Sequence, residues 1–145
     1  RVLFRSYDMP EDDKESMPDQ YKTVSLEEFV EYSKSMFAYW TEDDFASSFR
    51  KMLTIEQFRS EEMQGLYQQY LSSGPAAYVK DLFESMGIAH AEENAVRFYA
   101  TMYFYYSVYD GADDKEKVKN EFASAIGSMA QEWIKQPKLT QIRKS

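Results

Sequence analysis

The amino-acid sequence predicts an all-α fold. Between residues 25 and 136 the chain has one proline, Pro75, so little interrupts helix formation there. Apolar residues recur at intervals of three and four positions, which is the helical period. Several of these runs begin with a Ser, Thr or Asp residue that is followed three positions later by an acidic residue or Gln, a pattern typical of helix starts. No stretch alternates apolar and polar residues as a half-buried strand does.

The first helices are predicted from their capping residues. Ser25 and Glu28 form a capping-box pattern ahead of an apolar series that runs to Trp40. Thr41 and Asp44 repeat the start signal and predict a second helix.

Three further signals divide the middle of the chain. A third capping pattern begins at Thr54 and predicts a bend, and Ser60 is placed to cap the next helix. The Gly-Pro pair at residues 74–75 ends that helix and opens another, since proline suits a first helical turn. Gly87 is the predicted end of this helix.

Two long helices are predicted at the C-terminal side, over about residues 91–110 and 115–135. Each would be roughly 30 Å long, and the short loop between them favours an antiparallel pair. Counting these two, we expect about six helices. The segment 98–109 is unusual because seven of its twelve residues are aromatic and none is charged.

That aromatic segment predicts a partner. A surface helix needs one apolar stripe, whereas this segment is apolar on all sides, so both of its flanks need cover. One flank can face the chain's own core. The other would pair with a second copy to form a four-helix bundle that buries on the order of 1,600 Å² or more. The small residues Ala123, Gly127 and Ala130 would allow close helix approach, although they could also pack within one chain. The predicted interface comprises Phe104, Val108, Phe122, Ala123, Ile126, Gly127, Ala130 and Trp133.

Composition limits the classes of function. The net charge of −8 disfavours nucleic-acid binding, which needs clustered Lys and Arg. The chain has no cysteine and no apolar run long enough to span a membrane, so we expect a cytoplasmic protein with no membrane partner. Residues 1–24, rich in Asp and Glu with two prolines, are predicted to be a linker, residues 25–137 the helical domain, and residues 138–145 a flexible tail. Because the sequence begins at Arg1, it is expected to be a fragment of a longer protein, with tag removal or a disordered start as the alternative.

Motifs for catalysis are missing from the sequence. His90 is the only histidine, and there is no Glu-x-x-His pair, Gly-x-Ser-x-Gly elbow or Gly-rich phosphate loop. The acidic segment 110–114 lacks the ligand spacing of a calcium loop. We therefore expect no metal, no cofactor and no enzymatic activity.

Aromatic and sulfur-containing side chains suggest a small-molecule pocket instead. So many Tyr hydroxyl groups are difficult to satisfy in a dry core, whereas a cavity lined by aromatic rings and Met with a few polar groups is typical of a ligand site. Such a pocket suits a small apolar or aromatic ligand, including a cationic one. Ordinary core packing is the alternative for each residue. The candidates are Phe37, Trp40, Phe45, Phe49, Met52, Tyr67, Tyr70, Tyr78, Tyr99, Met102, Tyr103 and Tyr106.

Two stretches resemble a known family. Residues 37–59, from Phe37 to Arg59, and residues 97–111, which end in Tyr109-Asp110-Gly111 and precede a long amphipathic helix, resemble the C-terminal domain of tetracycline-repressor (TetR) family transcriptional regulators. The resemblance covers roughly residues 25–135, and its patterns are loose.

The resemblance implies an effector-binding domain that dimerises through its last two helices and holds the effector between the others. In that family a separate N-terminal helix-turn-helix domain binds operator DNA, and no such motif occurs in residues 1–24, so operator DNA would be bound only by a part outside this sequence. Two alternatives remain: a helical interaction module without a ligand, and a small helical enzyme that uses Tyr and acidic residues.

Overall fold

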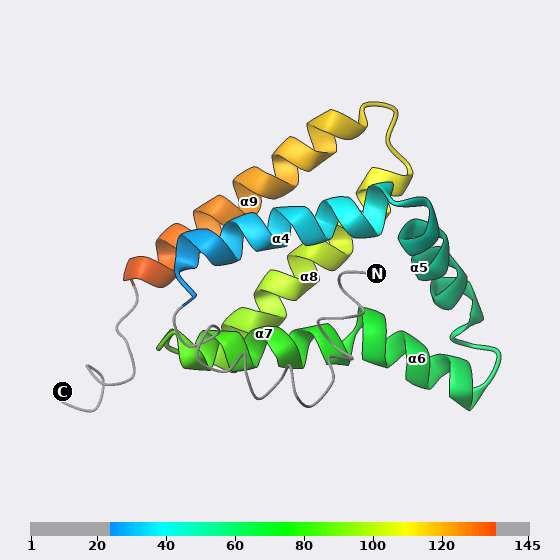
Figure 1. Ribbon diagram of the computed structural model, residues 1–145, viewed down its shortest axis with the longest axis horizontal. Coiled ribbons are helices and arrows are strands. Elements are labelled where there is room, and N and C mark those ends of the chain that lie inside the picture. Colours follow the sequence, from blue (N-terminus) through cyan, green and yellow to red (C-terminus); the bar gives the residue numbers. More distant parts are fainter. Residues whose placement is uncertain (1–23, 136–145) are drawn as a thin grey trace.

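The computed structural model describes residues 24–135, which form six α-helices and no strand (Figure 1). They are α4 (Leu26–Glu42), α5 (Asp44–Glu56), α6 (Glu61–Leu71), α7 (Ser73–Ser85), α8 (Ala91–Asp110) and α9 (Lys115–Lys135). The all-α prediction is therefore confirmed for this part of the chain. The predicted linker, apart from Val24, and the predicted tail at 138–145 lie outside the described residues.

The helix starts agree with the capping signals at α4 and differ at α5. The amide of Glu28 donates to the Ser25 hydroxyl at 3.1 Å, and the amide of Ser25 donates to the Glu28 carboxylate at 3.0 Å, which completes the capping box. At α5 the cap is Asp43, whose carboxylate accepts from the amide of Ala46 at 2.9 Å. Thr41 instead stays inside α4, and its hydroxyl donates to the carbonyl of Phe37 at 2.7 Å.

The bend predicted for the Thr54–Gln57 pattern is present, because α5 ends at Glu56 and the chain turns at residues 57–59, but Thr54 itself does not cap a helix. Thr54 lies within α5, where its hydroxyl donates to the carbonyl of Arg50 one turn earlier, at 2.7 Å. A Thr side chain can satisfy its hydroxyl in this way inside a helix, so the same residue type marks a cap in one place and not in another. Ser60 does cap α6, and Pro75 lies in the first turn of α7.

Gly74 is required by the tight passage from α6 to α7. A Cβ atom at this position would overlap the backbone carbonyl of Gln69, which belongs to the preceding helix. No flexible side chain could move aside to relieve that overlap, because the obstacle is backbone. The one-residue break at Ser72 therefore depends on glycine two positions later.

Helix α8 occupies the centre of the arrangement and packs against α7, α9 and α4 (Figure 1). It is antiparallel to α9, since Thr101 contacts Met129 while Tyr105, one turn later in α8, contacts the earlier Phe122. The prediction of a long antiparallel C-terminal pair is confirmed. The α5–α6 hairpin projects beyond the end of α4 (Figure 1).

Aromatic rings hold these helices together in two clusters. Phe37 of α4 stacks on Phe122 of α9 with ring centroids 4.3 Å apart and on Tyr106 of α8 at 5.6 Å. The second cluster joins α4, α7, α8 and α9 through Phe29, Phe83, Phe98 and Trp133. Such ring pairs each contribute about 0.5–1.5 kcal/mol beyond the burial of their area.

A buried arginine joins α5 to the ends of α4 and α8. Arg50 is 5% exposed, and its Nε donates to the carbonyl of Trp40 at 3.0 Å. Its two Nη atoms donate to the two carboxylate oxygens of Asp110, at 2.7 and 3.0 Å. This bidentate geometry satisfies a charge that would otherwise be costly to bury.

Replacing Arg50 should destabilise the protein. Arg50→Met leaves the Asp110 carboxylate without its partner and the Trp40 carbonyl without its donor, so we expect a loss of about 2–3 kcal/mol in the free energy of unfolding. Urea denaturation followed by circular dichroism measures it. Lys34→Met is the matched control, because Lys34 forms an exposed pair with Glu31 and its loss should cost under about 0.5 kcal/mol. Equal midpoints for the two variants would contradict this role of Arg50.

Candidate functional site

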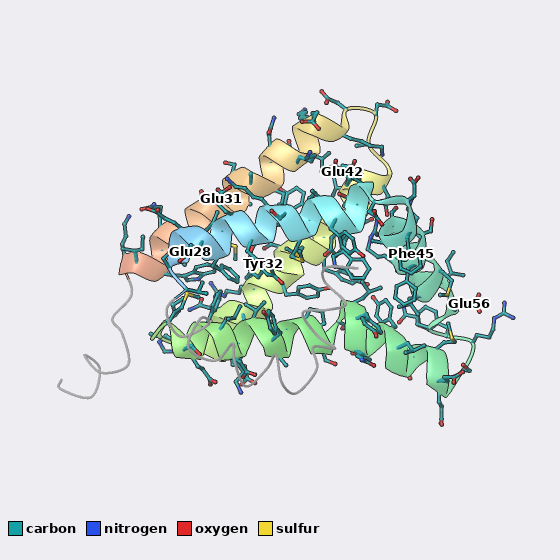
Figure 2. All side chains as sticks on the ribbon, in the orientation of Figure 1. Glu28, Glu31, Tyr32, Glu42, Phe45 and Glu56 are labelled. Carbon is teal, nitrogen blue, oxygen red and sulfur yellow. The ribbon has the colours of Figure 1, made fainter. Side chains whose placement is uncertain are left out.

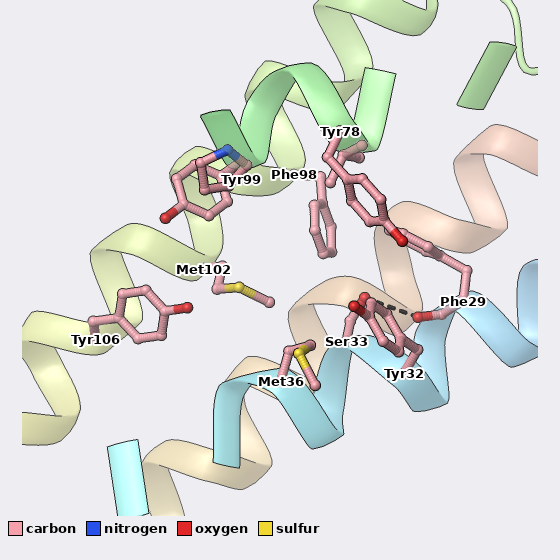
Figure 3. A pocket seen from close by; sticks show the side chains of 11 residues that line it. Phe29, Tyr32, Ser33, Met36, Tyr78, Phe98, Tyr99, Met102 and Tyr106 are labelled. Atoms are coloured by element: carbon pink, nitrogen blue, oxygen red, sulfur yellow. Dashed lines mark hydrogen bonds between the residues drawn. The ribbon is translucent and has the colours of Figure 1, made fainter. Parts of the chain in front are cut away.

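A small apolar cavity lies between α4, α7 and α8 (Figure 3). Its volume is about 30 Å³, whereas pockets for drug-sized ligands measure roughly 300–1,000 Å³. The cavity is therefore closed to a ligand in this conformation. Its walls are formed by Phe29, Tyr32, Ser33, Met36, Pro75, Tyr78, Val79, Phe98, Tyr99, Met102 and Tyr106.

Two polar groups at this cavity bond to the backbone. The Ser33 hydroxyl donates to the carbonyl of Phe29 at 2.8 Å, and the Tyr99 hydroxyl donates to the carbonyl of Leu71 at 2.6 Å. Met36 and Met102 face each other from α4 and α8 (Figure 3). Their unbranched thioether chains can adopt several rotamers, so this wall is the most adaptable part of the cavity.

Four of the predicted pocket residues line the cavity, namely Tyr78, Tyr99, Met102 and Tyr106. The set of predicted pocket residues omitted the α4 wall formed by Phe29, Ser33 and Met36, and it omitted Phe98. The signal was present, because positions 29, 33 and 36 repeat at helical spacing on one face of α4. That spacing is equally typical of ordinary core, which is why it does not single out a pocket.

Phe37 and Trp40 lie in the core and not at the cavity. Phe37 is 1% exposed and stacks on α8 and α9, and Trp40 is completely buried beside Tyr39 at the end of α4. Both positions share the helical face that covers the C-terminal helices, so their aromatic character serves packing.

Four other candidates, Phe45, Phe49, Met52 and Tyr70, lie on the α5–α6 hairpin, which also carries Tyr67. Phe45 and Met52 are exposed to solvent, at 59% and 39%. Phe49 stacks on Phe45 and meets the edge of Tyr70, with ring centroids 5.9 and 5.6 Å apart. These residues do not line the cavity, because the chain changes direction at Asp43 and the α5–α6 hairpin lies away from the cavity wall formed by α4.

A second hollow lies beside the cavity. It is a cleft of about 260 Å³ lined by Arg50, Thr54, Leu71, Tyr103, Tyr106, Ser107 and Asp110. Tyr106 lines both spaces, so the cavity and the cleft meet at this residue. The remaining candidates meet nearby, where the hydroxyl of Tyr67 on α6 contacts that of Tyr103 on α8.

The Tyr106 side chain is held on two sides. Its ring stacks on Phe37, and the Arg50 guanidinium lies 4.8 Å from the ring centroid. Burial raises the pKa of the Tyr106 phenol well above its usual value of 10, and the nearby Arg50 charge opposes this only in part. The phenol is therefore neutral at all physiological pH values.

The predicted interface residues fall into three groups. Phe122, Ile126, Ala130 and Trp133 are all buried in the core of a single chain, which makes them unavailable as surface contacts. Phe104 on α8 is 60% exposed, and Val108 is half-buried. The prediction placed the apolar face of α9 against a second copy, but α4 and α7 of the same chain cover that face.

Ala123 and Gly127 are half-buried on α9. Gly127 and Ala130 line a groove of about 370 Å³ between α9 and the first turns of α4. A Cβ atom at Gly127 would have no neighbour within 4 Å, so packing within the chain does not require glycine there.

Residues 24–135 contain no group of three or more His, Asp or Glu side chains arranged to hold a metal ion. None of the helices in this range is both long enough and apolar enough to span a membrane. His90 is exposed and precedes α8 with a left-handed backbone conformation. No protein-family model matches the chain, and neither a curated protein nor a solved structure matches it.

The buried phenol of Tyr106 predicts a loss of stability at alkaline pH. Because its pKa is raised in the folded state, the unfolded chain releases this proton first as the pH passes 10, and the free energy of unfolding then falls by up to about 1.4 kcal/mol per pH unit. Urea denaturation between pH 9 and 11 measures the slope. Tyr106→Phe should make the slope shallower, and an unchanged slope would contradict the assignment.

Proposed function

We propose that this chain is the effector-binding and dimerisation domain of a TetR-like transcriptional regulator. The proposal rests on one observation: α8 lines the apolar cavity and also has a side that is exposed to solvent. One side of this helix forms a wall of the apolar cavity, and its outer side bears the exposed residues Val96 and Phe104. A ligand that alters the cavity would therefore act on the same helix that meets a second copy.

The closed cavity is compatible with a ligand site that opens on binding. Met36 and Met102 form its adaptable wall, and reorienting them costs less than moving packed rings. The ligand would be small and apolar or aromatic, because the surrounding side chains are mostly apolar. Ligand binding would then select the expanded conformation over the closed one.

Operator DNA would be bound by a separate helix-turn-helix domain and not by this chain. The net charge of −8 opposes contact with phosphates. Glu28, Glu31 and Glu42 project from α4 and illustrate the acidic character of this surface (Figure 2).

A ligand-free interaction module is the second candidate, and one observation favours it. Phe45, Met52, Ile55 and Phe58 are all exposed on or just beyond α5, with exposed fractions from 39% to 83%. Apolar groups concentrated in one segment are typical of a binding surface. In that case the cavity would be only a small packing defect.

A ligand screen separates the two candidates. Hydrophobic amines, fatty acids and neutral aromatic compounds are added to the intact chain, and the melting temperature is measured. We expect at least one compound to raise it in a concentration-dependent way, because a ligand that binds only the folded state stabilises it. A Met102→Trp variant, which fills the cavity, should lose the response. A screen without any stabilising compound would favour the ligand-free module.

Dimerisation is tested at the exposed phenylalanine of α8. Phe104→Glu places a charge in the proposed α8–α9 contact, where burial without a partner is costly, so sedimentation velocity should show a shift from dimer to monomer. Phe58→Glu is the matched control, since Phe58 is also an exposed phenylalanine but lies outside α8 and α9. A wild-type monomer, or a Phe104→Glu variant that remains a dimer, would overturn this interface.

A further inference from the structure

We infer that the cleft beside Asp110 is the polar end and entrance of the ligand site, and that it takes an aromatic or alkyl amine. This inference rests on the proposed function, since it names the ligand class and the entrance of the same site. Three observations support it. The cleft lies next to the cavity, its walls contain hydrogen-bond acceptors and aromatic rings, and the C-terminal end of α8 binds Arg50 and Lys115.

The cleft adjoins the apolar cavity at Tyr106. Tyr106 lines both spaces, with the cavity of about 30 Å³ on one side and the cleft of about 260 Å³ on the other. Joining them into one space close to the size that small ligands need would require the Tyr106 ring to leave its stack on Phe37, at a cost that ligand binding must offset. An amphipathic ligand would then place its apolar part toward Met102 and its polar group in the cleft.

The walls of the cleft offer hydrogen-bond acceptors and aromatic rings. Arg50 is 5% exposed, and three of its N–H groups are already used by Asp110 and by the Trp40 carbonyl. The Asp110 side chain is 27% exposed, and carboxylate oxygens can each accept more than one hydrogen bond. A ligand therefore meets the carboxylate and the exposed Ser107 before it meets the guanidinium, so a donor group fits better than an acceptor.

The same end of α8 already binds two cationic groups of the chain itself. Lys115 donates to the carbonyl of Tyr109 at 2.8 Å, and its Nζ lies 4.7 Å from the centroid of the Tyr109 ring. Arg50 lies in a similar way over Tyr106. The negative end of the helix dipole and the tyrosine rings favour cations here. Tyr103 also lines the cleft and is 41% exposed. Among the described residues, no Lys or Arg lies over its ring, so the ring can contact a ligand's cation.

The charged groups near the cleft determine how strongly it favours an ammonium group. Arg50 and Lys115 carry two positive charges against the single negative charge of Asp110 and about half a charge from the helix dipole, so the local net charge does not favour a cation. A ligand's ammonium group must therefore gain from hydrogen bonds and from the tyrosine ring. A carboxylate ligand would face the Asp110 carboxylate and could reach Arg50 only at its two remaining N–H groups. Amines should therefore bind better than alcohols of the same shape, and carboxylates should bind worst.

The test uses three compounds of one shape and charge changes at one exposed position. Isothermal titration calorimetry on the intact chain compares 2-phenylethylamine, 2-phenylethanol and 3-phenylpropanoate. We expect the amine to bind about tenfold more tightly than the alcohol. Ser107→Asp should strengthen amine binding by about threefold and Ser107→Lys should weaken it similarly, with little effect on the alcohol. The same two substitutions at Ser35, exposed on α4, are the matched controls.

The outcomes separate this inference from the proposed function. If the library screen finds ligands but the amine has no advantage over the alcohol, or the Ser107 substitutions act no more strongly than those at Ser35, the amine-binding cleft is wrong and the effector domain stands. If neither the screen nor the three compounds bind, both fall. Ser107→Trp, which fills the cleft from an exposed position, should abolish binding while circular dichroism shows unchanged helix content.

Discussion

The stacking of Phe37 on Tyr106 and Phe122 is the contact on which the rest of the structure depends. It brings a residue of α4 between two helices that begin more than fifty positions later in the chain. Rings in parallel contact tolerate little displacement, because dense packing leaves no space for them to move into. Phe37 thereby sets where α4 crosses the C-terminal pair. It also fixes the Tyr106 ring, at which the cavity and the cleft meet.

The α5–α6 hairpin is attached in a different way. Its links to α8 include polar side chains, with Arg50 bound to Asp110 and Tyr67 in contact with Tyr103. Exposed apolar residues such as Phe45 and Ile55 add little to its hold on the domain. The hairpin also contributes Ala46, Leu53 and Leu71 to the hydrophobic core, so apolar packing holds it in place as well. It forms one wall of the cleft through Arg50, Thr54 and Leu71.

Helix α8 explains how one segment can serve two purposes. Its aromatic run from Phe98 to Tyr109 has buried residues toward α4, α7 and α9, and exposed ones on the opposite side. The inner tyrosines have raised pKa values where burial dominates, as at Tyr106, and remain neutral. The outer ones offer ring faces and hydroxyl groups to a ligand or to a second copy. The two roles follow from the side of the helix on which a ring falls.

The candidate site was only partly predictable from the sequence. Tyr78, Tyr99, Met102 and Tyr106 were identified because aromatic and Met side chains recur on helices expected to surround a pocket. Phe37 has the same chemistry and the same periodicity, yet it packs in the core. Residue type and spacing tell which face of a helix is apolar, but they do not tell whether that face meets another helix or a void.

By itself the sequence determined the helical class, most helix boundaries and the antiparallel C-terminal pair, because caps, breaks and short loops act over a few residues. Only the tertiary structure decided what each apolar face covers. The sequence predicts that Phe122 and Ile126 contact a second copy. In the structure both are buried within one chain, where α4 and α8 pack against α9. The pairing of Arg50 with Asp110, sixty residues apart, was equally beyond local patterns. Contacts between distant segments depend on how whole helices cross, and no short stretch of sequence records that angle.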